Sequence, residues 1–350
     1  MSTLRLNLLL LSPTCVGRQP TAPGQIAETH SYISGTALRG AIAGLLLAGR
    51  RPEQLPDQQR AWFTHAMIEE QVRFGNAHPF SRDGRTWIVP GTAWSDKRNG
   101  GWSGEQNKPG ITDVLPALLR DEDTGDLDRI SDEFVLEPRG PRWKGIPVRR
   151  RLISRTAIAE TGGSPVGGRG TAADGLLYSF EALETRQEFS AAIDGPDMLI
   201  DTLQSLLPRN TVLRIGQGRS RGLGQVQVTD TTIVPEEMRD AGQLAATASA
   251  FCQAVANDDP EYLYLPVTLE ADMLLRDNYL IPCASGEVAV TLSRYMRNPV
   301  PPSMELFYAV QDTRWIGGWD DVRRLPRSPQ LTVAQGSVWV YRVVKAELDQ

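Results

Sequence analysis

Early in the chain stands the sequence Tyr32-Ile33-Ser34-Gly35-Thr36-Ala37-Leu38-Arg39-Gly40. Apolar residues then recur at the spacing of one helix face, which predicts a helix from Leu38 onward. Ser34 or Thr36 can cap its first turn, and Gly49 can end it. The apolar run Leu4–Leu11 predicts a buried strand before it, so the chain starts as strand and helix. The apolar face of this helix comprises Leu38, Ala41, Ile42, Leu45 and Leu46.

The order of the predicted strands and helices indicates the fold class of the first half of the chain. A strand–helix–strand beginning and a later helix–strand–strand end predict an α+β fold with a ferredoxin-like sheet and large insertions. A generic α+β domain of unrelated topology fits the same pattern, and the pattern alone leaves both open. The further elements predicted in this half are helices over Pro56–Glu70 and Asp197–Leu207 and strands over Val72–Phe74, Leu176–Leu183, Phe189–Ile193, Thr211–Ile215 and Gln225–Val228.

The second half of the chain is predicted to be rich in strands. With 350 residues the chain is long enough for two domains, and an amphipathic helix over Pro235–Ala256 is expected to link them. We expect one domain at 1–235, with an insertion at about 80–170 that is least regular over 80–145, and a second at 236–350. The strands expected after the linking helix are Tyr264–Leu269, Val288–Leu292, Leu306–Val310 and Ser337–Val343.

The composition is that of a soluble globular protein. Hydrophobic residues make up 41% of the sequence and charged residues 23%, and no apolar stretch reaches the ~18–20 residues of a membrane span. The three cysteines are odd in number and widely spaced, which excludes a disulfide framework or a CxxC metal site and fits a reducing cytoplasm. The net charge of −5 argues against a free-standing nucleic-acid binder. A local basic patch can still bind nucleic acid, because salt screens surface fields beyond ~8 Å.

The most informative segment for chemistry is rich in glycine and arginine. It reads Ile215-Gly216-Gln217-Gly218-Arg219-Ser220-Arg221-Gly222-Leu223-Gly224, and we call it the glycine-arginine loop. Glycines permit positive φ and close approach, backbone N–H groups in such turns can hold anions, and arginine forks suit phosphate. Arg209 and Arg214 flank it. A long hairpin turn with solvated arginines fits the same spacing, and neither a P-loop nor GxGxxG is present.

Two further basic segments are candidate nucleic-acid contacts. On a strand, Arg149, Arg151 and Arg155 would share one face, next to a glycine-rich loop at Gly162–Gly170. Such a strip could hold a single RNA strand, or it could simply balance the acidic run Asp121–Asp128. In the second segment, Lys97 and Arg98 lie between Trp94 and Trp102. Basic and aromatic side chains together can bind and stack RNA bases, but they are also common at protein–protein interfaces.

The late sequence GxGRSRGLGxVxV, paired with the early YISGTALRGAIAG, resembles the RAMP superfamily of CRISPR-associated proteins. The resemblance implies RRM-like, ferredoxin-type domains, two in tandem, with the early motif starting the first helix and the late loop contacting guide RNA (crRNA). The RNA contacts expected on this basis are Gly216, Gly218, Arg219, Ser220, Arg221, Gly222, Gly224, Arg39, Lys97, Arg98, Arg149, Arg151 and Arg155.

Other segments resemble one branch, the tag-binding, group 5-like RAMP subunit of type III-D effector complexes. This implies a non-catalytic subunit that holds the 5′ tag of the guide RNA, beside other RAMP backbone subunits and a large polymerase-like subunit. Relatives often carry paired CxxC cysteines, but Thr112–Arg155 contains no cysteine, so we expect no metal there and no cofactor. The segments are Val89–Ala93, Asp96–Arg98, Gly110–Asp113, Arg155–Ile158, Gly175–Leu183, Gly317–Trp319, Leu325–Arg327 and Gly336–Val340.

Two alternatives to a non-catalytic RNA-binding subunit stay open. The first is a RAMP endoribonuclease that processes guide RNA or cuts target RNA, with His30, Asp96 or Asp113 as the candidate catalytic group. A lone histidine more often packs, and a single carboxylate without a partner is weak evidence for acid–base chemistry, since most Asp residues in such loops form turns. The second is a protein–protein scaffold whose arginines serve ion pairs. We expect no catalytic residue.

Overall fold

In the computed structural model of the protein, the strands of the described residues are mostly antiparallel, with few helices among them. The chain forms two compact units. Unit 1 comprises Met1–Phe80, Val148–Glu236 and Gly317–Pro329, and unit 2 comprises Ser81–Pro147, Glu237–Ile316 and Gln330–Gln350. The structure describes residues 1–17, 26–102, 110–138, 143–156, 177–235, 249–255, 261–277, 279–284, 301–320 and 325–347.

The core of unit 1 is an antiparallel sheet with β1 (Ser2–Leu10) at its centre. Its strand order is β13–β14–β1–β12–β2, and β3 also pairs with β12. Leu4, Leu6, Leu8 and Leu10 are fully buried, whereas the residues between them are not, because alternate side chains of a strand point to opposite faces. The predicted strand at Leu4–Leu11 is confirmed. The other strands are β2 (Arg73–Phe74), β3 (His78–Pro79), β12 (Glu188–Gly195), β13 (Val212–Arg214) and β14 (Gln225–Pro235).

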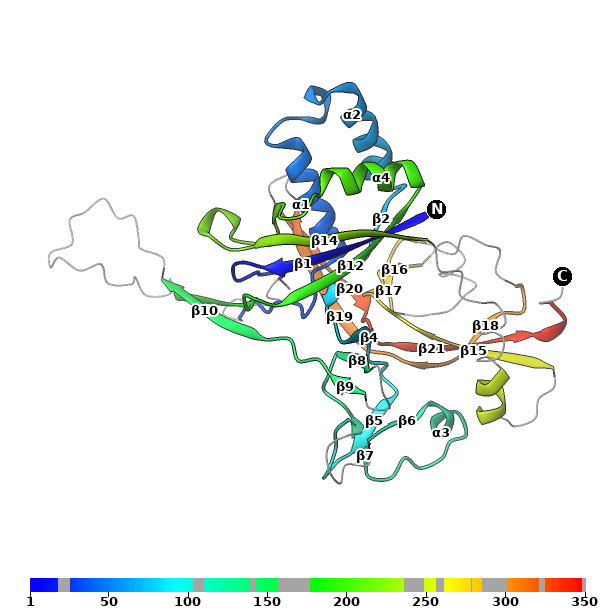
Figure 1. The fold of residues 1–350 in the computed structure, drawn as a ribbon. Coiled ribbons are helices and arrows are strands. Elements are labelled where there is room, and N and C mark those ends of the chain that lie inside the picture. Colours follow the sequence, from blue (N-terminus) through cyan, green and yellow to red (C-terminus); the bar gives the residue numbers. More distant parts are fainter. Residues whose placement is uncertain are drawn as a thin grey trace, which may run out of the picture. The chain divides into compact units, whose positions relative to one another are not determined.

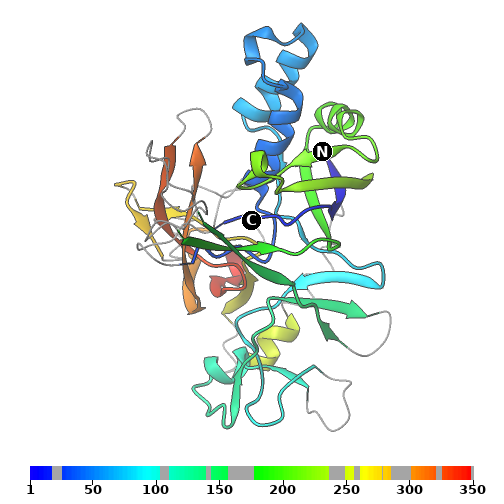
Figure 2. The same ribbon diagram turned by 90° about the vertical axis from the view of Figure 1, so that its left-hand side faces the viewer.

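Three helices supply the other half of this core, and Figures 1 and 2 show them on one side of the sheet. In α1 (Gly35–Leu47), the Ser34 hydroxyl accepts the Ala37 N–H at 3.3 Å, as the capping pattern predicted. The helix ends before Ala48 and Gly49, which both have positive φ. The helix predicted over Pro56–Glu70 is present over Asp57–Ile68, but its second part is π-helical: α2 (Asp57–Phe63) continues directly into a π-helical turn at Thr64–Ile68. The third helix is α4 (Asp197–Leu206), and a 3₁₀ turn covers Pro52–Gln54.

The order of these elements gives two interleaved strand–helix–strand units. Helices α1 and α2 both lie in the chain between β1 and β2, which run parallel to each other because both pair antiparallel with β12 between them. Helix α4 lies in the chain between β12 and β14, which run parallel on either side of β1. The predicted strand–helix–strand beginning and the predicted helix–strand–strand end are therefore both present in unit 1.

Unit 2 consists of small sheets. Residues 80–145, which the sequence predicted to be irregular, contain two three-stranded sheets, β4–β8–β9 and β6–β5–β7. A third sheet, β15–β21–β18, follows later, and residues 249–255 are helical. The elements of this unit are β4 (Gly84–Ile88), β5 (Ala93–Asp96), β6 (Ile111–Asp113), α3 (Leu115–Leu119), β7 (Leu127–Arg129), β8 (Phe134–Pro138), β9 (Lys144–Gly145), β15 (Tyr262–Thr268), β16 (Leu275–Arg276), β17 (Pro282–Cys283), β18 (Glu305–Val310), β21 (Val338–Val344) and a 3₁₀ turn at Lys345–Glu347. The paired strands β19 (Thr313–Asp320) and β20 (Leu325–Val333) are divided between the two units, because Gly317–Pro329 belongs to unit 1.

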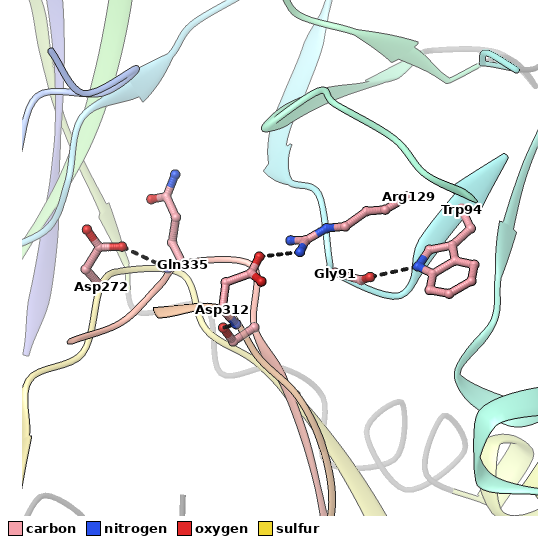
Figure 3. A network of polar contacts seen from close by, with 7 residues as sticks. Gly91, Trp94, Arg129, Asp272, Asp312 and Gln335 are labelled. Atoms are coloured by element: carbon pink, nitrogen blue, oxygen red, sulfur yellow. Dashed lines mark hydrogen bonds and ion pairs between the residues drawn. The ribbon is translucent and has the colours of Figure 1, made fainter. Parts of the chain in front are cut away.

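Polar contacts join the early and late segments of unit 2 (Figure 3). Arg129 at the end of β7 forms an ion pair with Asp312, and the Gly91 N–H donates to the Gly336 carbonyl at 2.7 Å. Asp272 accepts the Gln335 N–H at 2.9 Å. Arg129 and Asp312 are 183 residues apart in the chain and Gly91 and Gly336 are 245 apart, so contacts of this kind group 81–147 with the C-terminal part.

Several sequence predictions concern residues outside the described ones. They are the loop Gly162–Gly170, the strand Val288–Leu292 and most of the helix Pro235–Ala256. The division into domains at 1–235 and 236–350 stays a prediction. Within the described part of the chain, no helix is both long and apolar enough to span a membrane.

Candidate nucleic-acid interface

The glycine-arginine loop lies between β13 and β14 of unit 1. All four glycines of the loop have positive φ, as expected. The values are 80° at Gly216, 69° at Gly218, 83° at Gly222 and 72° at Gly224. Between them, Arg219–Arg221 form one 3₁₀ turn. The three residues of this turn are exposed, so the loop presents two guanidinium groups and one hydroxyl at the surface.

Two of these glycines are required by close packing as well as by φ. A Cβ atom at Gly216 would overlap the Cys15 carbonyl, and one at Gly224 would overlap the Ile215 carbonyl. Both obstacles are backbone atoms, which cannot rotate away. By contrast, a Cβ atom at Gly222 would meet open space. The loop is therefore fixed at its two ends and open at its tip.

The backbone N–H groups of the loop are largely used within the fold. Gln217 N–H donates to the Cys15 carbonyl at 2.9 Å, and Gly224 N–H donates to the Pro13 carbonyl at 2.9 Å. The N–H groups of Arg221 and Leu223 both donate to the Gly218 carbonyl, at 2.8 and 3.3 Å. These four N–H groups are therefore not available to hold an anion, and a backbone cradle would have to use other N–H groups of the loop. Phosphate contact here would depend on arginine side chains.

A basic two-stranded arm also belongs to unit 1. It consists of β10 (Arg150–Thr156) and β11 (Leu177–Leu183), which pair antiparallel and extend away from the main sheet (Figure 1). Arg151 and Arg155 lie two pleats apart on one face, as predicted, and the Arg155 guanidinium lies 5.8 Å from the centre of the Phe180 ring. Arg149 precedes the strand and forms an ion pair with Glu184 at 3.8 Å. A cation above an aromatic ring on an exposed strand pair is a surface suited to stacked bases and phosphates.

One short segment connects the arm to the glycine-arginine loop. Thr14 forms a β-bridge with Leu183 at the end of β11, and the next residue, Cys15, forms a β-bridge with Gln217 in the loop. Both Thr14 and Cys15 are fully buried. The arm and the loop, which are distant in sequence, are therefore attached to adjacent residues of one strand-like segment. Nothing in the local sequence around Thr14 signals this connection.

The groups beneath this connection are neutral or internally bonded. Burial, and then the charge of Glu181, raise the pKa of the Cys15 thiol to about 11, so the thiol stays protonated at neutral pH. The Thr29 hydroxyl accepts the Val16 N–H at 3.1 Å, and the His30 N–H donates to the Val16 carbonyl at 3.0 Å. This network supports the segment that carries the arm and the loop.

The histidine predicted as a catalytic candidate is a buried side chain in an aromatic stack. The ring of His30 lies 5.0 Å from that of Tyr32, and Tyr32 meets His78 edge-on at 6.1 Å. Burial lowers the pKa of His78 to about 4, so this ring is uncharged at neutral pH. The arrangement is typical of packing.

The remaining predicted contact residues lie elsewhere. Arg39 on α1 donates to Glu70 at 3.0 Å and to the Met67 carbonyl, which ties the helix to the π-helical turn. Lys97 and Arg98 belong to unit 2 and follow β5, with the Lys97 N–H donating to the Asp126 carbonyl at 2.9 Å. The structure thus joins the loop and the arm within unit 1 through Thr14 and Cys15, and Arg39 of the same unit is engaged with the π-helical turn and Glu70 instead.

The two carboxylates considered for catalysis both bond to backbone in turns. Asp96 accepts the N–H groups of Arg98 and Asn99 at 2.8 and 2.7 Å. Asp113 accepts the Leu115 N–H at 3.1 Å at the start of α3. Asp side chains commonly bond to backbone two or three residues ahead in this way to stabilise turns.

Comparisons with known proteins give only distant structural likenesses. No protein-family model and no curated protein matches the chain. A chain of the type III-B Cmr-beta complex bound to cognate target RNA is similar over 99% of this chain and 88% of its own length, at 11% identity and a TM-score of 0.48. Oligomeric Cmr4 from Pyrococcus furiosus is similar over 67% of this chain and 99% of its own length, at 14% identity and a TM-score of 0.29. Likenesses this distant carry no argument about function.

Proposed function

We propose that this chain is a RAMP-superfamily subunit of a type III CRISPR effector complex that binds guide RNA and does not cut it. The proposal rests on two sequence motifs and on the elements that they occupy. The early motif surrounds the start of α1, and the late motif forms the loop between β13 and β14. The sheet order β14–β1–β12–β2, with its two interleaved strand–helix–strand units, supports a ferredoxin-like domain.

The observation that carries the proposal is the connection at Thr14 and Cys15. It attaches an arm bearing Arg151 and Arg155 and a loop bearing Arg219 and Arg221 to neighbouring residues. Several cations along one path suit a phosphodiester chain, which presents regularly spaced charges and bases that can stack on aromatic rings. The glycine turn places Arg219 and Arg221 at the surface of the loop, where an RNA strand could reach them.

The finer assignment follows from the segments that resemble the tag-binding branch. On this proposal the chain holds the 5′ tag of the guide RNA, beside other RAMP backbone subunits and a large polymerase-like subunit. It requires no metal or cofactor for this role. The first check is whether the chain copurifies with a short RNA and with other subunits from the cells that produce it.

Guide binding is expected to weaken steeply with salt. If Arg151, Arg155, Arg219 and Arg221 each meet one phosphate, log K should fall with log salt at a slope of about −3, because single strands release about 0.7 counterion per neutralised phosphate. The measurement is a fluorescence titration of the purified chain with a synthetic single-stranded RNA that carries the repeat-derived tag of the host. Binding that is absent or independent of salt would contradict the RNA-binding proposal and favour a protein scaffold.

No RNA cleavage by this chain is expected. Labelled guide precursor and complementary target RNA should stay intact with the wild-type chain, since Asp96, Asp113 and His30 are held in turns or in a buried stack. Cleavage by the wild type that disappears in Asp96→Asn, Asp113→Asn or His30→Gln would overturn the proposal. The asparagine variants are suitable controls for folding, because an amide oxygen can accept the same backbone N–H groups while the charge is lost.

A further inference from the structure

An exposed arginine at the root of the arm has a left-handed backbone. Arg186 lies in the turn that joins β11 to β12, and its φ is 61°. Glycine and asparagine adopt this conformation easily in hairpin turns, whereas other residues do so at a cost. Residues held in such backbone are often kept where their side chain has a use. An arginine at this position is therefore explained by its guanidinium group and not by the turn.

The guanidinium group of Arg186 is available for an external anion. Across the residues that the structure describes, it forms no ion pair and no hydrogen bond. The nearest acidic residue before it, Glu184, pairs with Arg149 at 3.8 Å instead. Arg214 on β13 is also exposed, and within the same described ranges its side chain has no ionic or hydrogen-bonding partner. Unit 1 therefore presents two unengaged cations besides those of the arm and the glycine-arginine loop.

Arg186 and Arg214 lie on either side of the end of β1. The Arg186 N–H donates to the Leu10 carbonyl at 2.8 Å, and the Leu11 N–H donates to the Gln225 carbonyl at 2.9 Å. Gln225 is in turn the register partner of Arg214 in the pair of β13 and β14. Neighbouring strands lie about 4.8 Å apart, so the backbones of the two arginines are separated by three strand spacings, or about 14 Å.

The arm and the loop are attached on these same two sides. Next to Arg186, the Gln187 amide accepts the Arg149 N–H at 2.8 Å and donates to the Arg149 carbonyl at 2.9 Å, directly before β10. On the other side, Arg214 directly precedes the glycine-arginine loop. Arg186 and Arg214 therefore occupy the interval between the cations of the arm and those of the loop.

We infer that Arg186 and Arg214 bind phosphates of the RNA strand where it passes from the arm, across the end of β1, to the glycine-arginine loop. The inference rests on the proposed function, because it adds two contacts and a course for the RNA at the same site. A phosphodiester chain carries regularly spaced negative charges, and a row of guanidinium groups suits it. An acidic protein surface would also complement two arginines. RNA is favoured because both lie in series with the arm and the loop.

Arg186→Asn removes the charge and keeps the left-handed backbone favourable. We expect about tenfold weaker binding of the tagged RNA, because one hydrogen-bonded ionic contact is lost, with thermal stability unchanged or higher. Arg214→Gln should weaken binding to a similar extent. The matched control is Arg73→Gln, which removes one exposed charge from β2 at the far edge of the same sheet. Its affinity should stay within about twofold of the wild type.

The salt dependence gives a second measure of the two contacts. With six phosphates neutralised in place of four, the slope of log K against log salt should be about −4 for the wild type. The double variant of Arg186→Asn and Arg214→Gln should bring the slope back to about −3. A wild-type slope near −3 that the double variant leaves unchanged would contradict both contacts.

The course of the RNA is tested by crosslinking in the chain isolated from cells with its RNA and partner subunits. A photocrosslinking phenylalanine derivative is placed at Leu11, which is 43% exposed between the two arginines, and at Met198 of α4, which is 80% exposed, as a control. We expect an RNA adduct at Leu11 and none at Met198.

The outcomes separate this inference from the proposed function. If the wild type binds RNA but Arg186→Asn and Arg214→Gln bind it equally well, or if Leu11 crosslinks to a protein or to nothing, the course across β1 is refuted and the proposed function stands. If the wild type does not bind the tagged RNA, both are refuted.

Discussion

Replacing Gly224 by alanine is expected to destabilise unit 1 by about 3 kcal/mol or more and to disrupt the glycine-arginine loop. The residue has a φ of 72°, and an added Cβ would overlap the Ile215 carbonyl. Left-handed backbone costs an alanine roughly 1–2 kcal/mol, and the clash must be relieved by moving backbone as well. The movement breaks the hydrogen bonds from Gly224 to Pro13 and from Ile215 to Gly224. Urea unfolding followed by circular dichroism measures the change in the free energy of unfolding.

Gly222→Ala is the matched control for this variant. Its φ of 83° is equally unfavourable to alanine, but a Cβ there would meet open space. We expect a loss of about 1 kcal/mol and nearly normal RNA binding. Equal destabilisation by the two variants would mean that packing against Ile215 contributes nothing, and the account of why the loop is fixed at its ends would fail.

Replacing Arg219 and Arg221 together by alanine is expected to weaken guide RNA binding by about a hundredfold. Each hydrogen bond to a charged group contributes roughly 1.5–3 kcal/mol, and the N–H groups of Gln217, Arg221, Leu223 and Gly224 are already engaged within the fold. The salt dependence should also change, with the slope of log K against log salt becoming shallower by about 1.4. The readouts are the dissociation constant for the tagged RNA and the amount of RNA that copurifies.

A control with the same change in net charge is available in the same unit. Arg50 and Arg51 are exposed residues just after α1, and their double alanine variant removes two positive charges away from the loop. We expect it to bind RNA within a few-fold of the wild type. If both double variants weaken RNA binding equally, the affinity depends on the overall charge of the chain and not on the loop. If neither variant weakens binding, the glycine-arginine loop does not bind the RNA.

The sequence was sufficient where local spacing determines structure. The alternation in β1, the apolar face and Ser34 cap of α1, and the helix at Asp197 all follow from interactions within a few residues. The positive φ values of the loop glycines were also predictable, because the residue type itself permits them.

The sequence was insufficient where distant segments pair. The bridge between Thr14 and Leu183 joins residues whose neighbours show no shared pattern, and no local rule predicts it. The sheets of residues 81–147 use strands of two to five residues, too short for alternation to be visible. The hydrogen bonds from the Gln217 and Gly224 N–H groups to the Cys15 and Pro13 carbonyls were hidden for the same reason.

The connection at Thr14 and Cys15 also determines when the proposed grip can exist. Cys15 leaves the ribosome about 200 residues before Gln217, its partner in the loop. At typical elongation rates of about 5–20 residues per second, this interval lasts roughly 10–40 s. During it the N-terminal segment has neither of its two β-bridge partners in that region for most of the time, since Leu183 also emerges late. The arm can therefore attach to the N-terminal segment before the loop does, and the complete surface arises only after Gln217 has been synthesised.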